Sequence, residues 1–205
     1  MFLILPIFAI YASGLPGSPS QLQIGIALGI YGLTQAAFQI PFGMSSDFFG
    51  RKKVIYFGLA LFVLGSIIAA TSTHIESIII GRAIQGAGAI SAVLTALLSD
   101  LTRDEHRTKA MAIVGASIGL TFALSLVISP WLNSKIGVPG IFFMMAILSI
   151  LAAIIIHFFI HETKRVNKKT ALNLKDFYTV LARFDLGRLN LGIFILHVAQ
   201  ISMFM

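Results

Sequence analysis

Long apolar runs separated by short polar segments make up most of this chain. A helix needs roughly 20 apolar residues to cross a hydrocarbon core of about 30 Å. Several runs approach that length, so the pattern predicts an all-α membrane protein. The predicted spans lie near Leu22–Met44, Val54–Thr71, Ser77–Ser99, Ala110–Pro130, Gly140–Ile160 and Leu189–Met205.

The two ends of the chain carry incomplete apolar runs. Met1–Tyr11 is apolar, but its eleven residues make a helix of only about 16 Å, which cannot cross alone. A signal peptide is the alternative, although no basic leader precedes this run and no cleavage site is clear. We interpret it as the outer half of a truncated first helix. The last run reaches Met205 without a polar tail, so we expect only part of a seventh helix there.

The polar segment 161–187 is the longest and divides the chain into three regions. We assign residues 1–160 to an amino-terminal transmembrane bundle, 161–187 to a cytoplasmic linker and 188–205 to the start of a carboxy-terminal bundle. In the linker, apolar residues recur at helical spacing, which predicts an amphipathic helix on the inner membrane surface. A solvated linker with one chance helical turn is the alternative. The residues concerned are Leu174, Phe177, Tyr178 and Leu181.

Composition agrees with a membrane protein. Hydrophobic residues make up 57% of the chain and charged residues 11%, whereas soluble domains carry about 25% charged residues. Cysteine is absent, which excludes disulfides and thiol metal sites. The spans contain no HExxH motif, no paired acids and no Ser/His/Asp set, so we expect neither an enzyme nor a cofactor or metal.

The net charge of +7 reflects topology and not nucleic-acid binding. Thirteen of the fifteen Lys and Arg residues lie in or beside three alternate polar segments, which must share one face of the membrane. Cytoplasmic segments carry such an excess, so we expect this face to be cytoplasmic, most simply at a bacterial inner membrane. These residues are Arg51, Lys52, Lys53, Arg103, Arg107, Lys109, Lys164, Arg165, Lys168, Lys169, Lys175, Arg183 and Arg188.

The first of these segments, Gly43–Lys53, is called the signature loop below. It places Asp47 and Arg51 one helical turn apart if the preceding helix continues into it. Gly43 removes a side chain at the inner end of the span, and Gly50 permits a turn. An ordinary positive-inside loop would explain Arg51, Lys52 and Lys53, but it would not explain Asp47 or the two spaced glycines.

A second unusual charge, Arg82, lies about five residues inside an apolar span. A charge there costs at least about 2.5 kcal/mol, so it must face protein or water and have polar neighbours. Gln85 lies on the adjacent helix face, while Gly86 and Gly88 allow close contact. The alternative is an arginine that extends to the headgroups.

Asp100 ends the same span on the face of the signature loop. An acid at a helix carboxyl end is unfavourable without a cationic partner, which favours pairing over a solvated side chain.

These motifs resemble those of the major facilitator superfamily of transporters. The signature loop is similar to G-x-x-x-D-x-x-G-R-[KR]-[KR], and residues 82–88 to the fourth-helix motif R-x-x-x-G-x-G. The stretches 29–36, 39–43 and 96–103 are similar to the YajR-type group of drug:proton antiporters. The resemblance implies the six-helix amino-terminal half of a twelve-helix transporter. It also implies that Asp100 joins Asp47 and Arg51 in a conformational switch.

The implied function is proton-coupled efflux of small amphipathic molecules by alternating access. Its partners would be the bilayer, the substrate, protons and a missing carboxy-terminal half. One motif departs from the antiporter pattern G-P-x-x-G-G, because Ser129 precedes Pro130 and Asn133-Ser134 replace the final glycines. A facilitator or symporter on the same fold, or a non-transporting fragment, is therefore the alternative.

Polar residues also recur along the second span. Tyr31, Gln35 and Gln39 recur at every fourth position with Phe38 beside them, which suits the wall of a central cavity. Hydrogen bonding between helices is the competing interpretation. His157 and His197 could titrate near neutrality, although interfacial or hydrogen-bonded histidines are more common. Small residues at Gly25 and Gly29, and at Gly115 and Gly119, predict close helix packing.

Overall fold

The computed structural model describes residues 2–88, 90–160, 187–188, 191–192 and 194–195, and helix is the only regular element in these residues. The chain divides into two compact units, Met1–Lys164 and Arg165–Met205. The described residues of the second unit are helical. The expected amphipathic helix of the linker and His197 lie outside the described residues.

The first two helices have clear starting signals. Helix α1, Leu5–Ser13, is the expected short helix and has a proline in its first turn. Helix α2, Gln21–Phe49, begins with a capping box. There the Ser20 hydroxyl accepts from the Gln23 backbone N–H at 3.3 Å, and the Gln23 side chain accepts from the Ser20 N–H at 2.8 Å. This exchange satisfies two N–H groups that a helix start otherwise leaves unpaired.

The signature loop is almost entirely helical, which corrects the expected polar loop. Helix α2 continues past Met44 to Phe49, and α3, Arg51–Thr71, begins after the single residue Gly50. Gly50 has a φ of 99°, a value that only glycine adopts readily. Hydropathy locates where the apolar segment ends, but a helix can continue beyond it into the polar headgroup layer.

The fourth span, Ile75–Leu101, contains two described helices. Helix α4 covers Ile75–Ala87 and α5 covers Ser91–Leu101. Glycine is a poor helix former, and Gly88 closes α4 by donating to the carbonyls of Ile84 and Gln85, both at 3.2 Å. The whole stretch from Ile75 to Leu101 is apolar and long enough to cross a membrane, as the sequence predicts.

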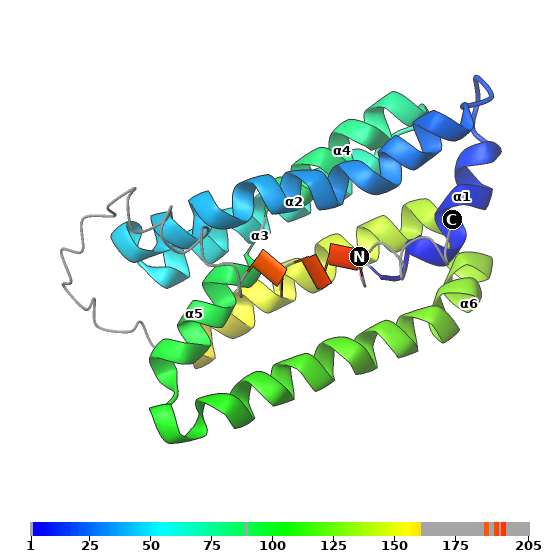
Figure 1. Cartoon of the computed structure of the whole chain (residues 1–205). Helices are drawn as coiled ribbons and strands as arrows, with labels where there is room; N and C mark the ends of the chain where they lie inside the picture. Colours follow the sequence, from blue (N-terminus) through cyan, green and yellow to red (C-terminus); the bar gives the residue numbers. More distant parts are fainter. Residues whose placement is uncertain (1, 89, 161–186, 189–190, 193, 196–205) are drawn as a thin grey trace. The chain divides into compact units, whose positions relative to one another are not determined.

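The fifth and sixth spans are continuous apart from one residue. Helix α6 covers Asp104–Phe159, and its only non-helical residue is Gly137, with φ 67° and ψ 175°. The two halves run in opposite directions on either side of this residue (Figure 1). The predicted spans end at Pro130 and resume at Gly140, but the helix continues to a positive-φ glycine that ends the first half, and Pro139 suits the first turn of the second.

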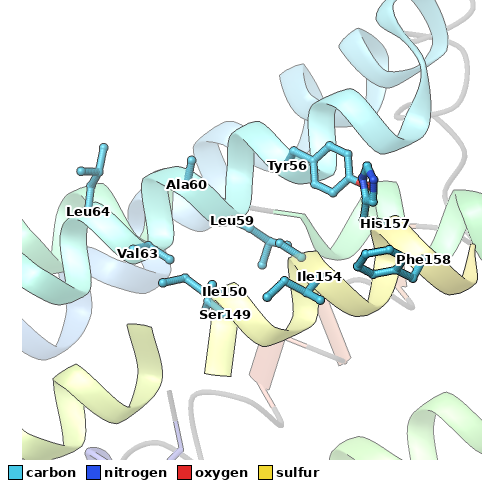
Figure 2. A pocket seen from close by; sticks show the side chains of 11 residues that line it. Tyr56, Leu59, Ala60, Val63, Leu64, Ser149, Ile150, Ile154, His157 and Phe158 are labelled. Carbon is cyan, nitrogen blue, oxygen red and sulfur yellow. The ribbon is translucent and has the colours of Figure 1, made fainter. Parts of the chain in front are cut away.

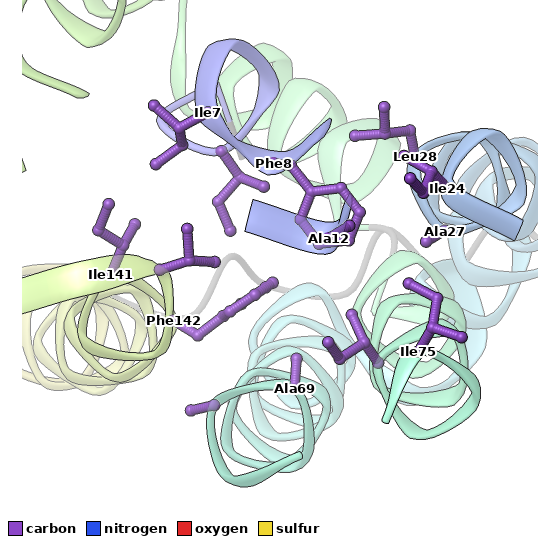
Figure 3. Close-up of a cluster of buried hydrophobic side chains, with 14 of the residues drawn as sticks. Ile7, Phe8, Ala12, Ile24, Ala27, Leu28, Ala69, Ile75, Ile141 and Phe142 are labelled. Carbon is purple, nitrogen blue, oxygen red and sulfur yellow. The ribbon is translucent and has the colours of Figure 1, made fainter. Parts of the chain in front are cut away.

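Helices α2, α3 and α4 lie side by side, and the second half of α6, residues 138–159, packs against α3 (Figure 1). The larger apolar core joins α1 to α2, α3, α4 and the second half of α6 (Figure 3). Phe8 and Phe142 are fully buried at its centre. A smaller core lies between α2, α3, α5 and the end of α6, and contains Phe42, Val54, Ile55, Leu59, Val93, Leu97 and Ile156.

Many large apolar side chains are exposed on the surface of the bundle. Ile10, Leu22 and Val127 are each more than 70% exposed. Among the described residues, Gln21–Phe49, Arg51–Thr71, Ile75–Leu101 and Asp104–Phe159 are long and apolar enough to cross a membrane. A straight helix of the length of α6 would extend about 84 Å, so its two halves account for two crossings.

Candidate functional site

The ion cluster of the signature loop joins the ends of three helices. Arg51 is the first residue of α3, and its Nη1 lies 2.6 Å from Oδ1 of Asp47, near the end of α2. Its Nε donates to Oδ2 of Asp100 in the last turn of α5 at 3.0 Å. The Arg51 side chain is 17% exposed, whereas Asp47 and Asp100 are 56% and 40% exposed. One largely covered guanidinium therefore bridges two solvated carboxylates.

Ser46 belongs to this cluster, and sequence reasoning missed it. Its side chain is buried, accepts from Nη1 of Arg51 at 2.5 Å and donates to the carbonyl of Gly43 at 2.6 Å. The hydroxyl therefore fixes the guanidinium against the backbone of α2. The signal available in the sequence was the spacing, because Ser46 is next to Asp47 and three residues after Gly43.

Gly43 is in ordinary contact with the opposing helix. A Cβ at this position would lie 3.7 Å from the Cβ of Ala92 in α5. The missing side chain is thus less critical than the sequence suggests, and Gly43 acts here mainly through its carbonyl.

Lys52 points away from the ion cluster. Its ammonium donates to the carbonyl of Ile160 at 2.7 Å and to that of His157 at 3.5 Å. These carbonyls lie at the end of α6, where a cation is favourable because the helix leaves its last carbonyls unpaired. His157 also lies 3.4 Å through Nδ1 from the hydroxyl of Tyr56.

The same end of the bundle holds Arg107. This residue pairs with Asp104 at 2.7 Å and donates to the carbonyl of Ser99 at 3.4 Å, next to Asp100. Arg51 and Arg107 are thus at one end of the described bundle, called the basic end below.

Arg82 is fully buried, pointing into the bundle and not toward the headgroups. Its Nε donates to the carbonyl of Ala27 in α2 at 3.2 Å, and its Nη1 donates to Oε1 of Gln85 at 3.3 Å. The guanidinium carbon lies 4.8 Å from the centre of the Tyr31 ring, a cation–π distance. Its second terminal nitrogen, Nη2, has no hydrogen-bond partner among the described residues.

A polar relay extends from Arg82 to the third helix. Gln85 is buried and donates through Nε2 to the hydroxyl of Ser66 at 2.6 Å, and Ser66 donates to the carbonyl of Phe62 at 2.7 Å. Arg82 therefore contacts α2 and α4 directly and is linked to α3 only through Gln85. Its recorded partners in the described bundle are a backbone carbonyl, an amide oxygen and an aromatic face, with no carboxylate among them.

Close helix contact around this relay depends on glycines. A Cβ at Gly86 would overlap the Thr34 hydroxyl and the Tyr31 backbone of α2, and one at Gly88 would overlap the Gly58 carbonyl of α3. Gly25, Gly29, Gly115 and Gly119, which the sequence predicts as packing sites, have no neighbour within 4 Å among the described atoms. Spacing alone does not show which face of a helix meets a neighbour.

The polar stripe of α2 separates into two environments. Tyr31 is buried against Arg82, so it takes part in contacts between helices. Gln35 and Gln39 are partly buried, and Phe38 is 42% exposed with its ring edge-on to Phe42. A role for these three residues in a cavity wall stays a prediction.

Comparison with known proteins identifies the family. The sequence profile of the Major Facilitator Superfamily matches residues 1–205. The chain is 48% identical over 206 residues to the inner membrane transport protein YajR of Escherichia coli K12, covering 100% of this chain and 45% of YajR. An uncharacterised transporter of Buchnera aphidicola subsp. Schizaphis graminum is 43% identical over 201 residues, covering 96% of this chain and 51% of that protein.

A more distant relative has a named resistance function. The class B tetracycline resistance protein of Escherichia coli is 31% identical over 149 residues, covering 72% of this chain and 37% of that protein. The chain therefore spans about half the length of the first two relatives. With its apolar helices and a family match along its whole length, this chain belongs to the Major Facilitator Superfamily and is an integral membrane protein of the transporter class.

Proposed function

We propose that this chain supplies the amino-terminal half of a proton-coupled efflux transporter of small amphipathic molecules, working by alternating access at the inner membrane. The main observation behind this proposal is that Arg51 forms ion pairs with both Asp47 and Asp100, which links the ends of α2, α3 and α5. One relative is named a tetracycline resistance protein, and a resistance function supports efflux in the proposal.

The ion cluster suits a switch better than a permanent brace. Exposed ion pairs contribute only about 0–1 kcal/mol, so they form and break at low cost. Both carboxylates are substantially exposed, and water can replace the guanidinium when the helix ends separate. In the proposed cycle the cluster closes the basic end in one state and opens in the other. Substrate would lie between this half and a second half of the same protein.

The proposal also includes coupling of transport to proton movement. Arg82 keeps its positive charge at any accessible pH, so it favours proton release from a carboxylic acid that approaches it. The acids in the described residues, such as Glu76 and Asp100, lie at helix ends. The proton carrier would then be an acid outside the described residues or a histidine.

The test uses the full-length protein in vesicles with an imposed pH gradient and a fluorescent lipophilic cation. We expect the gradient to drive cation movement, and we expect Asp47→Asn to slow it with little loss of folded protein. Asp104→Asn is the matched control, because it removes an exposed acid whose recorded partner, Arg107, lies within α6.

Equal rates for wild type and Asp47→Asn would contradict the switch. A transport rate that is independent of the pH gradient would instead support a facilitator. Ser129 and Asn133-Ser134, which stand in place of the antiporter glycines, suggest this alternative.

A further inference from the structure

An apolar groove of about 680 Å³ runs between α3 and the second half of α6 (Figure 2). Leu59, Val63, Ile150 and Ile154 line it, and Ala60 and Ala153 leave room between the helices. The groove is open on one side, as shown by Leu64, which is 55% exposed, and Phe158, which is 74% exposed. Both helices belong to segments that are long and apolar enough to cross a bilayer, which would place this opening at hydrocarbon depth.

One end of the groove is polar. Tyr56 and His157 face each other there across the groove, with the Tyr56 hydroxyl 3.4 Å from Nδ1 of His157 (Figure 2). Lys52 lies one helical turn before Tyr56 and donates to the carbonyls of His157 and Ile160. These groups lie at the basic end of the bundle, the level at which amphipathic aromatic residues meet the headgroup layer.

The charge at this end is positive. Among the described residues that line the groove, none is an acid. An ammonium has three N–H donors, and the two carbonyls occupy two of them, which leaves one for a further acceptor. His157 has a second ring nitrogen, Nε2, that can donate as well. An apolar channel with a cationic, hydrogen-bonding end complements a long hydrocarbon chain that carries an anionic head.

We propose that the groove between α3 and the second half of α6 binds an anionic phospholipid. One acyl chain would lie along Leu59, Val63 and Ile154, and the phosphate would accept from Lys52, with Tyr56 and His157 beside it. Basic pockets between membrane helices recognise anionic headgroups in this way. Because Lys52 also holds the end of α6, the bound phosphate would strengthen the link between the start of α3 and that helix end.

The test measures lipid association with the full-length protein. Delipidated protein is placed in phosphatidylcholine bilayers with trace phosphatidylglycerol or phosphatidylcholine spin-labelled on the acyl chain, and electron paramagnetic resonance gives the motionally restricted fraction. We expect wild type to prefer phosphatidylglycerol. Lys52→Ala should reduce that preference about fivefold, the effect of one lysine near an anionic surface, while Lys52→Arg should keep most of it.

Two controls separate the groove from general effects. Lys53→Ala removes the neighbouring exposed positive charge and should leave most of the preference, because it is Lys52 that donates to the carbonyls of His157 and Ile160 at the polar end of the groove. Ala60→Phe fills the groove and should reduce the restricted fraction even if Lys52→Ala fails to fold. Ala112→Phe adds the same bulk at an exposed position of the first half of α6, outside the groove, and should have no such effect.

Three outcomes would overturn the proposal. One is a wild type that does not distinguish the two lipids. Another is an equal loss in Lys52→Ala and Lys53→Ala, which would indicate general surface charge. The third is an oligomer that Ala60→Phe dissociates, because a second copy of the chain would then occupy the groove.

Discussion

Replacing Gly65 by alanine tests how closely α3 and α4 must approach. A Cβ at this position would lie 2.5 Å from the backbone nitrogen of Gln85 and 2.5 Å from the carbonyl oxygen of Gly81. Ordinary contact begins at 3.4 Å, so the helices would have to separate by about 0.9 Å. Neither neighbour is the end of a flexible side chain, so the strain cannot be relieved by a rotamer change.

The expected change in the unfolding free energy of Gly65→Ala follows from two opposing effects. Extra volume in a well-packed core costs about 1–3 kcal/mol. Alanine also favours a helix over glycine by up to about 1 kcal/mol. Gly25→Ala in α2 isolates the second effect, because nothing described lies within 4 Å of a Cβ there. The difference between the two variants is then the packing term, about 5- to 150-fold in the unfolding equilibrium constant.

The assay is equilibrium unfolding of the full-length protein in mixed micelles with increasing sodium dodecyl sulfate, followed by circular dichroism. We expect Gly65→Ala to unfold at a lower detergent fraction than wild type and Gly25→Ala at an equal or higher one. Two variants of equal stability would refute the close approach of α3 and α4.

Three further predictions concern the polar groups of the bundle. Arg82→Lys should slow transport by the full-length protein, because lysine keeps the charge but cannot reach Ala27 and Gln85 with a planar fork. Arg82→Ala should slow transport more, and normal proton-coupled rates in this variant would contradict the prediction. Ser46→Ala should slow transport in the same vesicle assay while Ser45→Ala does not, because only Ser46 accepts from Arg51. Ser20→Ala should lower the unfolding free energy by about 1 kcal/mol through loss of the cap, measured by the detergent titration above.

The sequence predicts the helical membrane fold because hydropathy is averaged over whole spans. It also places Arg82 in the interior, because a guanidinium inside an apolar run has few ways to be solvated. Its contact with Gln85 follows from their spacing on one helix. The carbonyl of Ala27 could not be predicted, since it depends on how α2 and α4 are turned toward each other.

Connections are where prediction from the sequence is wrong. The turn at Gly137 needs one residue, whereas the predicted spans leave a longer connection between Pro130 and Gly140. This turn depends on the positive φ of a glycine, which hydropathy does not encode. Ser46 was missed for a related reason, since its role depends on the guanidinium that reaches it and not on its own position in a motif.

The polar contacts of Arg82 have a consequence for how the chain is made. Its recorded partners outside α4 are Ala27 and Tyr31 of α2, and the relay through Gln85 ends on Ser66 of α3. All of these precede Arg82 in the sequence, and a ribosome delivers them first. We therefore expect α2 and α3 to be in the bilayer already when the fourth span leaves the translocation channel. With this order of synthesis, the charge of Arg82 need not be exposed to lipid until a later helix is inserted.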